Sequence, residues 1–257
     1  MCLSLIIPVH DCETTITEEV WSLAQAASRV RADWELVFVD RGSRDRTPEI
    51  LERLRHHEPR LNLVYQCRKK DVGEALRSGF LHARGEVMVI LDRPGEWNLS
   101  RLGEWVGALE SCDLVAGYRR RGPRAADHGL TGWLFRGLLK LPPTVRESGV
   151  CVMRRELLQR NDFLEAGREA FWELPARVVR QGGVLKMVPV PFFPRNPAQD
   201  PPMGPTWLTC LDLALKIRQT PPQPLFTPLH EVSTTRLRLE FLAGQDGGTE
   251  GRLSLEN

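Results

Sequence analysis

Short apolar runs recur along the first half of the chain, and each is short enough to form one buried strand. They are rich in Val, Ile and Leu, and the segments between them are long enough to hold helices. The runs are LSLIIPV (3–9), WELVFVD (34–40), LNLVYQC (61–67), VMVILD (87–92) and DLVAGY (113–118). The intervening helices are predicted over 13–30, 47–56, 72–83 and 99–109. Apolar strands that alternate with helices predict an α/β fold with a mostly parallel central sheet, covered by helices on both faces.

The pattern becomes less regular after residue 118. The apolar positions there predict a helix over 130–141, a strand running into a helix over 149–158, a helix over 169–180, a strand over 183–192 and an amphipathic helix over 206–218. A Pro-rich loop precedes the last helix, and from 219 the chain is polar and rich in Pro and Gly. The sequence thus predicts one domain over 1–218 and a C-terminal tail over 219–257. The amphipathic helix is expected to pack against the domain, with contact to a membrane interface as the alternative.

Polar residues follow the predicted strands at the edge where ligands bind in such sheets. In open parallel sheets that edge is formed by the carboxyl ends of the strands, where loops and helix N-termini converge. These ends carry the segments 8–11, 40–43, 67–70 and 92–96. Two of the strands finish on an aspartate, Asp40 and Asp92, although a purely structural strand has little reason to end on an acid. The sequence therefore predicts a functional site at this edge, with both aspartates in it.

The overall charge and the cysteines argue against several classes of protein. Lys and Arg total 35 and Asp and Glu total 33, so a net charge of +2 gives no field that would attract nucleic acid. The six cysteines lie singly, without a Cys-x-x-Cys pair, which argues against a zinc site or a disulfide framework. No stretch approaches the roughly 20 apolar residues that span a bilayer, and the N-terminus lacks the features of a signal peptide. We expect no transmembrane segment, no nucleic-acid partner, and a location in the cytoplasm or peripheral to a membrane.

Four segments carry a resemblance to a known family, and they occur in the family's order along the chain. They are SLIIPVHD (4–11), ELVFVDRGSRDRTPEIL (35–51), RKKDVGEALRSGFLHARGEVMVILD (68–92) and LVAGYRRR (114–121). Together they resemble the family 2 glycosyltransferases, which have the GT-A fold, a single Rossmann-like domain. Within that family they resemble the branch of dolichyl- and polyprenyl-phosphate sugar synthases. The resemblance covers residues 3–218 and is most specific over 35–47.

The resemblance implies a nucleotide-sugar donor, UDP- or GDP-linked, at the ends of the first two strands. Carried over by position, Pro8, Val9 and Asp11 would line the base, and Asp40 would bond the uracil or the ribose. Asp92 would be the remaining acid of a motif that holds Mg²⁺ or Mn²⁺ on the diphosphate, because a hard cation neutralises the charge that builds up on the leaving group. The same donor site would include Arg41, Gly42 and Arg68.

The sequence departs from the family pattern inside this predicted donor site. The family usually reads Asp-Asp-Gly-Ser at the second strand, where this chain has Arg41 in place of the second acid. It usually reads Asp-x-Asp after the fourth strand, where this chain has Asp92, Arg93 and Pro94. The two arginines are interpreted as drift, as solvent-facing residues, or as guanidinium groups that replace the cation on phosphate oxygens. Asp92 is either a ligand of a metal or ribose, or a loop carboxylate that caps a helix or pairs with a nearby arginine.

Basic residues mark the side on which the acceptor would bind. In the related synthases, basic residues after the fifth strand and near the Pro-rich loop meet the phosphate of a lipid-phosphate acceptor, and Arg119 and Arg195 occupy similar positions. A phosphate acceptor is already anionic, so the reaction would need no general base. With Asp92 and Arg93, these two arginines are the predicted catalytic residues. The alternative for the basic segment 119–124 is a solvated loop.

Two functions are compatible with these residues. The first is an active, inverting glycosyltransferase that moves a hexose from a nucleotide sugar to a polyprenyl phosphate or a similar acceptor at a membrane surface. The alternative is a catalytically inactive GT-A domain that serves as a nucleotide-binding or scaffolding module. An open, acid-lined cleft at the strand ends would favour activity, whereas Arg93 or Trp97 filling the nucleotide pocket would favour the scaffold.

Overall fold

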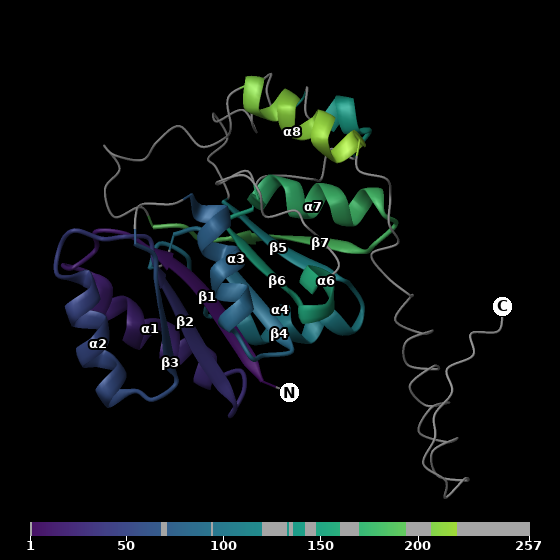
Figure 1. Ribbon diagram of the computed structural model, residues 1–257. Helices are drawn as coiled ribbons and strands as arrows, with labels where there is room; N and C mark the ends of the chain where they lie inside the picture. The colour runs from purple at the N-terminus through teal and green to yellow at the C-terminus, as the bar shows by residue number, and fades with distance from the viewer. Residues whose placement is uncertain are drawn as a thin grey trace, which may run out of the picture.

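Seven strands form one sheet, and helices cover both of its faces (Figure 1). The computed structural model describes residues 2–67, 71–93, 95–119, 133, 136–141, 148–159, 170–193 and 207–219. The strands are β1 (Leu3–Val9), β2 (Trp34–Asp40), β3 (Leu61–Tyr65), β4 (Val87–Leu91), β5 (Leu114–Arg119), β6 (Val150–Arg154) and β7 (Leu185–Val190). The helices are α1 (Ile16–Ser28), α2 (Thr47–His57), α3 (Val72–His82), α4 (Leu102–Gly107) with the 3₁₀ turn η1 (Ala108–Glu110), α6 (Arg155–Gln159), α7 (Ala170–Arg180) and α8 (Trp207–Gln219).

The strand order across the sheet is β3-β2-β1-β4-β6-β5-β7. The chain moves outward from β1 to β2 and β3, and it then returns to place β4 on the other side of β1. Neighbours are parallel from β3 through to β4, whereas β6 runs antiparallel to both β4 and β5. Successive strands are added on one side of β1 up to β3 and then, with β4, on its other side, so the boundary between β1 and β4 is a topological switch point. Open α/β sheets bind ligands there, outside the carboxyl ends of their strands.

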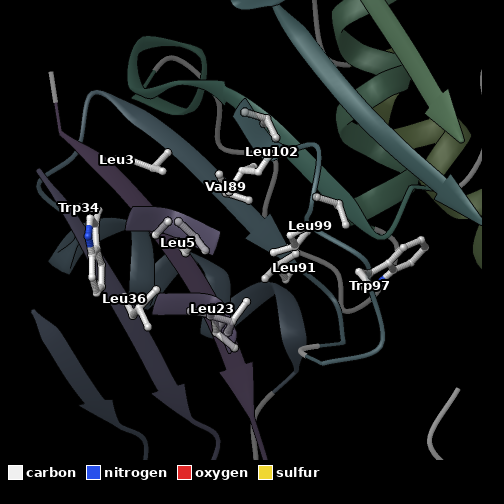
Figure 2. Packing of buried hydrophobic residues seen from close by; sticks show 14 of the residues in the cluster. Leu3, Leu5, Leu23, Trp34, Leu36, Val89, Leu91, Trp97, Leu99 and Leu102 are labelled. Carbon is white, nitrogen blue, oxygen red and sulfur yellow. The ribbon is translucent and has the colours of Figure 1, made fainter. Parts of the chain in front are cut away.

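The two faces of the sheet carry separate cores because side chains alternate along each strand. On β1, Leu5 and Ile7 face the layer of α1, α2 and α4, while Ile6 faces α3 and α7. Figure 2 shows the first of these cores, with Trp34, Leu36 and Val89 beside Leu5. Each fully buried aliphatic side chain of this kind contributes about 1.5–3 kcal/mol of burial free energy. The strands are therefore fixed in register by both layers, and so are the loops at their ends.

Helix α8 packs on α7, outside the layer that covers the sheet (Figure 1). Leu213, Ala214 and Ile217 of α8 are buried against Trp172 and other residues of α7, and Arg180 Nη1 donates to the Ile217 carbonyl at 2.6 Å. The expected packing of this helix is confirmed. No helix in the described ranges is long and apolar enough to cross a membrane.

The predicted α/β class and the mostly parallel sheet are confirmed, with differences at the ends of elements. The helix predicted over 13–30 begins at Ile16 and ends at Ser28, and the one predicted over 99–109 is a short helix from Leu102 followed by a 3₁₀ turn. The antiparallel direction of β6 was not predicted. The proposed tail over 219–257 lies, apart from Gln219, outside the described residues, so the division at 218 stays a prediction.

Candidate functional site

The carboxyl ends of β1, β2 and β3 lie side by side. Val9 pairs with Asp40, and Asp40 pairs with Tyr65 in the next strand. The ladder extends one residue further, since the Arg41 amide donates to the Val9 carbonyl at 3.0 Å and the Gln66 amide donates to the Asp40 carbonyl at 2.9 Å. The polar residues that follow neighbouring strands are thus held about one strand spacing, roughly 4.8 Å, apart.

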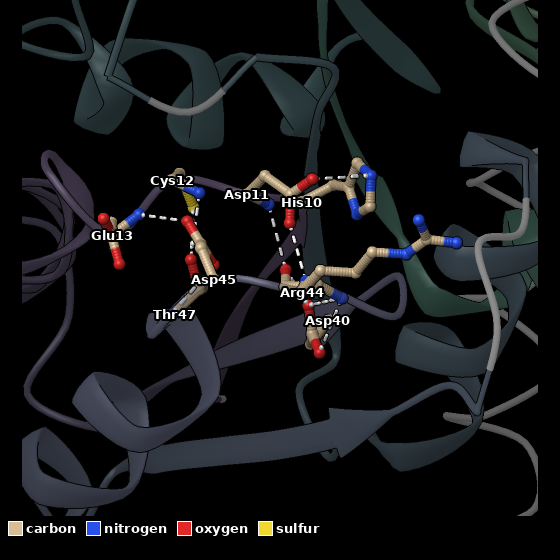
Figure 3. Close-up of polar contacts among 9 residues, drawn as sticks. His10, Asp11, Cys12, Glu13, Asp40, Arg44, Asp45 and Thr47 are labelled. Carbon is tan, nitrogen blue, oxygen red and sulfur yellow. Dashed lines mark hydrogen bonds and ion pairs between the residues drawn. The ribbon is translucent and has the colours of Figure 1, made fainter.

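The loop after β1 and the loop after β2 are joined by reciprocal hydrogen bonds (Figure 3). Asp11 donates its backbone N–H to Ser43 Oγ at 2.9 Å, and Asp11 Oδ1 accepts the Arg44 amide at 2.7 Å. Asp11 has a positive φ of 49°, a conformation that aspartate adopts more readily than most residues. Further bonds between the two loops run from the Cys12 amide to Thr47 Oγ1, from the Glu13 amide to Asp45 Oδ2 and from the Arg46 amide to Glu13 Oε2. Each loop therefore supplies acceptors for the other's backbone, which fixes both.

Asp40 is buried, with 4% of its surface exposed, and it organises the turn that follows β2. Its Oδ1 accepts the Ser43 amide at 3.1 Å and the Ser43 hydroxyl. Gly42 lies between them with a φ of 77°, where a side chain would be strained. Asp40 therefore closes the turn after β2. A carboxylate offers about four lone-pair sites, so the turn does not exhaust the acceptor capacity of Asp40.

A cavity of about 580 Å³ opens at these strand ends. It is lined by His10, Asp11, Asp40, Gly42, Ser43, Arg44, Gln66 and Cys67. Ligand sites for small molecules and cofactors have volumes of about 300–1,000 Å³, so this cavity is large enough for a nucleoside. Two of its lining residues are carboxylates, which are suited to accepting hydrogen bonds from hydroxyl and amide groups.

Ionisable groups beside this cavity are shifted by burial and by hydrogen bonding. Burial, together with the nearby carboxylate of Glu19, raises the pKa of Cys12 to about 12, so this thiol stays protonated at neutral pH. Burial alone would raise the pKa of Asp45, but hydrogen bonds from Thr47 and from the Glu13 amide outweigh it and lower that pKa. Asp45 therefore keeps its negative charge, which supports the backbone of both loops.

The end of β4 is built differently, because a tryptophan packs directly on Asp92. Trp97 Nε1 donates to Asp92 Oδ1 at 2.6 Å, and the Asp92 amide donates to the Gly149 carbonyl at 3.0 Å. The Trp97 ring lies flush against Gly149: a Cβ at that position would be 1.9 Å from Trp97 Cζ2 and 2.7 Å from Asp92 Oδ1. Trp97 is 7% exposed. The orientation of the Asp92 carboxylate is therefore fixed by a buried indole.

Phe192, which follows β7, contacts Trp97 and two arginine side chains in this part of the sheet's edge. Its ring centroid is 4.8 Å from that of Trp97, and the backbones of the two residues form an antiparallel bridge. The guanidinium of Arg119 lies 4.5 Å from the Phe192 centroid and that of Arg93 lies 5.5 Å from it, both within cation–π range. Arg93 Nη1 also pairs with Glu96 Oε2 at 3.3 Å. We call Arg93, Glu96, Trp97, Arg119 and Phe192 the Phe192 cluster.

The side chains after β4 do not fit a divalent metal ion. Asp92 offers a single carboxylate, and its Oδ1 already accepts the Trp97 N–H. The next acid, Glu96, is ion-paired with Arg93, whose permanent positive charge opposes a second cation. Among the residues that the structure describes, no group of three or more His, Cys, Asp or Glu side chains could hold a metal ion.

The structure brings the predicted site residues together in two groups. Asp11, Asp40 and Gly42 line the cavity, whereas Asp92, Arg93 and Arg119 lie at or beside the Phe192 cluster. Pro8 and Val9 are buried in β1 and Arg41 stands next to the cavity, and none of the three is among its lining residues. Arg68 and Arg195 lie outside the described residues.

Several residues of both groups were not predicted. His10, Ser43 and Cys67 line the cavity, and they stand in the strand-end segments that already marked this edge, so the sequence did contain their signal. Arg44 follows one of these segments directly. Phe192 had no signal, because its contact with Trp97 joins segments far apart in the chain.

The sequence profile described as glycosyl transferase family 2 matches residues 4–159. This match covers more than half of the chain, so the chain belongs to that family. The matched range runs from β1 to the end of α6, and it includes the cavity, Asp92, Arg93, Trp97 and Arg119.

Several curated proteins with similar sequences are named as transferases that act on dolichyl or undecaprenyl phosphate. The chain is 29% identical over 117 residues to dolichyl-phosphate beta-glucosyltransferase ALG5C of Trichomonas vaginalis, a match to 44% of this chain and 35% of that protein. It is 33% identical over 92 residues to undecaprenyl-phosphate 4-deoxy-4-formamido-L-arabinose transferase of Shewanella sediminis, a match to 35% of this chain and 28% of that protein. The chain thus matches about a third of the length of these relatives.

Solved structures share the fold. Glucosyl-3-phosphoglycerate synthase from Mycobacterium tuberculosis, in complex with Mn²⁺, uridine diphosphate and phosphoglyceric acid, superposes with a TM-score of 0.61 at 22% identity, covering 86% of this chain and 79% of that one. TarS of S. aureus superposes with a TM-score of 0.55 at 20% identity, covering 73% of this chain and 58% of that one. At these identities the likeness establishes the GT-A fold and nothing further about this chain.

Proposed function

We propose that this protein is an inverting glycosyltransferase that moves a hexose from a UDP- or GDP-sugar to a polyprenyl phosphate or a similar phosphate-bearing acceptor. The observation that carries the proposal is the acid-lined cavity at the carboxyl ends of β1, β2 and β3, beside the topological switch point of a family 2 chain. That is the place where an open α/β sheet binds a nucleotide.

The nucleoside of the donor is assigned to this cavity. Asp40 and Asp11 present carboxylate oxygens that can accept hydrogen bonds from the ribose hydroxyls or the base, and Gly42 keeps the turn beside them free of a side chain. Hydrogen bonds between the loops hold these groups in place before a ligand arrives, which reduces the ordering cost of binding.

The reacting sugar is assigned to the ends of β4 and β5. An acceptor phosphate oxygen attacks C1 of the sugar, the bond from C1 to the donor diphosphate breaks, and a nucleoside diphosphate leaves. In this proposal Asp92 accepts hydrogen bonds from the donor's hydroxyl groups, which is supported by the fixed orientation that Trp97 gives its carboxylate. Arg119 is proposed to bind the acceptor phosphate, and that phosphate is already anionic, so no general base is needed.

The acceptor class is supported by the relatives, whose names specify dolichyl phosphate and undecaprenyl phosphate. Such an acceptor would place the reaction at a membrane surface. Neither Trp97 nor Arg93 is among the residues that line the cavity at β1, β2 and β3. The observation that would have favoured an inactive scaffold is therefore not met at the nucleoside site.

A transfer assay tests the proposal. The purified protein is incubated with radiolabelled UDP- and GDP-hexoses and undecaprenyl phosphate in detergent, and label that becomes extractable into organic solvent is counted. We expect incorporation from one nucleotide sugar, and its loss in Asp40→Asn. Absence of transfer, together with no binding of UDP or GDP at millimolar concentration, would overturn the proposal.

A further inference from the structure

The Phe192 cluster places two guanidinium groups on one aromatic ring at the end of β4. Arg93 and Arg119 lie 5.5 and 4.5 Å from the Phe192 centroid, although they come from different strand ends. The side chain of Arg93 is 15% exposed, so it is largely enclosed yet still reaches the surface. Glu96 and Phe192 together restrict Arg93 to one region.

The strand order relates the position of Arg93 to that of the cavity. Asp40 ends β2 and Arg93 follows the end of β4, and the two strands are separated by β1 alone. Two strand spacings amount to about 10 Å. A nucleotide whose base and ribose occupy the cavity would extend its diphosphate across the end of β1 toward β4. Arg93 is therefore near the expected position of the diphosphate.

A diphosphate that becomes a leaving group needs a positive charge beside it. The residues after β4 do not fit a metal ion. The Asp92 carboxylate is bound by the indole of Trp97 and the Glu96 carboxylate is paired with Arg93, so both are poor ligands for a cation. Arginine supplies a permanent charge, and its planar fork of N–H donors matches phosphate oxygens. A guanidinium has five N–H donors, so one edge can hold a carboxylate while another holds a phosphate.

We propose that Arg93, positioned by Phe192 and Glu96, binds the diphosphate of the nucleotide donor in the place where a divalent metal ion would otherwise be needed. Donor binding by this protein is therefore independent of Mg²⁺ and Mn²⁺. This inference rests on the proposed function, because it concerns the donor of that reaction. It assigns to Arg93 a role in charge neutralisation, and to Phe192 the role of a positioning residue.

Calorimetric titration tests the inference without an activity measurement. UDP, GDP and the corresponding nucleosides are titrated into the full chain, once with EDTA and once with Mn²⁺. We expect the preferred diphosphate to bind with the same affinity, within about twofold, under both conditions, and at least tenfold more tightly than its nucleoside. The tenfold difference corresponds to about 1.4 kcal/mol, within the range of a hydrogen bond to a charged group.

Substitutions test whether the contribution to diphosphate affinity is specific to Arg93. Arg93→Ala should weaken binding of the diphosphate roughly 10- to 100-fold and leave nucleoside binding unchanged, because only the diphosphate contact is lost. Arg93→Lys keeps the charge without the fork and should fall between. Arg101→Ala is the matched control, since Arg101 pairs with Glu104 in the same i,i+3 spacing on the exposed surface of the chain. It should change neither affinity.

The outcomes distinguish the inference from the function on which it rests. If UDP or GDP binds only when Mn²⁺ is present, the inference is overturned and the proposed function stands. The inference also fails if Arg93→Ala, or Arg93→Lys should the alanine variant not fold, leaves diphosphate affinity at the wild-type value. If no nucleotide binds in either condition, both are overturned.

Discussion

The two halves of the sheet's carboxyl edge are filled in different ways. At the ends of β1, β2 and β3 the loops bind each other through backbone and short polar side chains, and they leave a cavity of about 580 Å³. At the ends of β4, β5 and β7 the space holds two large aromatic rings, with arginines on one of them. The first half, at the ends of β1, β2 and β3, can admit a ligand as it stands, and we call it the open half. The second, at the ends of β4, β5 and β7, fixes the orientation of charged groups, and we call it the packed half.

The retained acids of the family pattern differ between the two halves in what surrounds them. Asp40 is retained in the open half, where its carboxylate both closes a turn and faces the cavity. In the packed half, Arg93 stands beside the one retained acid, Asp92, and that acid is bound by Trp97. Under the proposed function, recognition of the nucleoside and neutralisation of the diphosphate would fall to different ends of the sheet's edge, and each end carries one arginine in place of a family acid, Arg41 in the first and Arg93 in the second.

Replacing Asp40 should produce the largest change in ligand binding. Asp40→Asn keeps the shape but removes the charge, so we expect UDP or GDP, and the matching nucleoside, to bind roughly 10- to 100-fold more weakly, as for loss of a hydrogen bond to a charged group. Calorimetry measures both ligands. Asp212→Asn, an exposed acid on α8, is the control. An equal loss of affinity in both variants, or a loss for the diphosphate alone, would show that the nucleoside does not bind in this cavity.

Adding one methyl group should disrupt the packed half alone. In Gly149→Ala the new Cβ would overlap Trp97 and Asp92, so we expect a loss of about 1–3 kcal/mol in the free energy of unfolding, measured by chemical denaturation. Nucleoside affinity should stay near the wild-type value. The matched control is Gly107→Ala in α4, where a Cβ meets nothing within 4 Å, and where alanine should be neutral or stabilise by up to about 1 kcal/mol. Similar losses in the two variants would contradict the packing described here.

The affinity for the nucleotide sugar should depend on the indole N–H of Trp97 more than on the size of its ring. Trp97→Phe removes the hydrogen bond to Asp92, and we expect nucleotide-sugar affinity to fall about threefold to tenfold, in line with a net hydrogen bond of roughly 1 kcal/mol. Trp34→Phe is the matched control because Trp34 is equally buried but its Nε1 makes no hydrogen bond. Both variants should lose thermal stability. If Trp97→Phe and Trp34→Phe changed the nucleotide-sugar affinity equally, the hydrogen bond to Asp92 would have no role in binding.

The thiol of Cys67, in the open half, reports on ligand binding without any substitution in the chain. Cys67 is exposed and lines the cavity, whereas Cys12 is held as an unreactive thiol by its raised pKa. At neutral pH, UDP or GDP at about ten times its Kd should slow alkylation of Cys67 about tenfold, as measured by peptide mass spectrometry. Alkylation that the nucleotide leaves unchanged would place its binding site elsewhere.

Most of the open half could be predicted from the sequence, because its signals are local. The apolar runs located β1 to β5, and the rule for parallel sheets then placed Asp11, Asp40 and Gly42 at one edge. The turn at Ser43 was also readable from the residues around Gly42. Those inferences needed only the order of the elements and the chemistry of neighbouring residues.

The packed half could not be predicted in the same way. Its defining contact joins Trp97 to Phe192, and hydrophobic periodicity contains no information on which distant segments meet. The antiparallel direction of β6, which brings Gly149 beside Asp92, likewise depends on tertiary pairing. In α8, Leu213 is buried whereas Leu215 is 46% exposed, a distinction that depends on the contact with α7.

A crystal structure of the protein grown with a UDP- or GDP-sugar in the presence of Mn²⁺ would show where the donor binds and whether a metal ion accompanies it. We expect the base and ribose in the cavity beside Asp40 and Cys67, with the diphosphate against Arg93 and no metal between the diphosphate and Asp92. A nucleotide bound away from the ends of β1, β2 and β3, or a Mn²⁺ ion bridging Asp92 to the diphosphate, would contradict it.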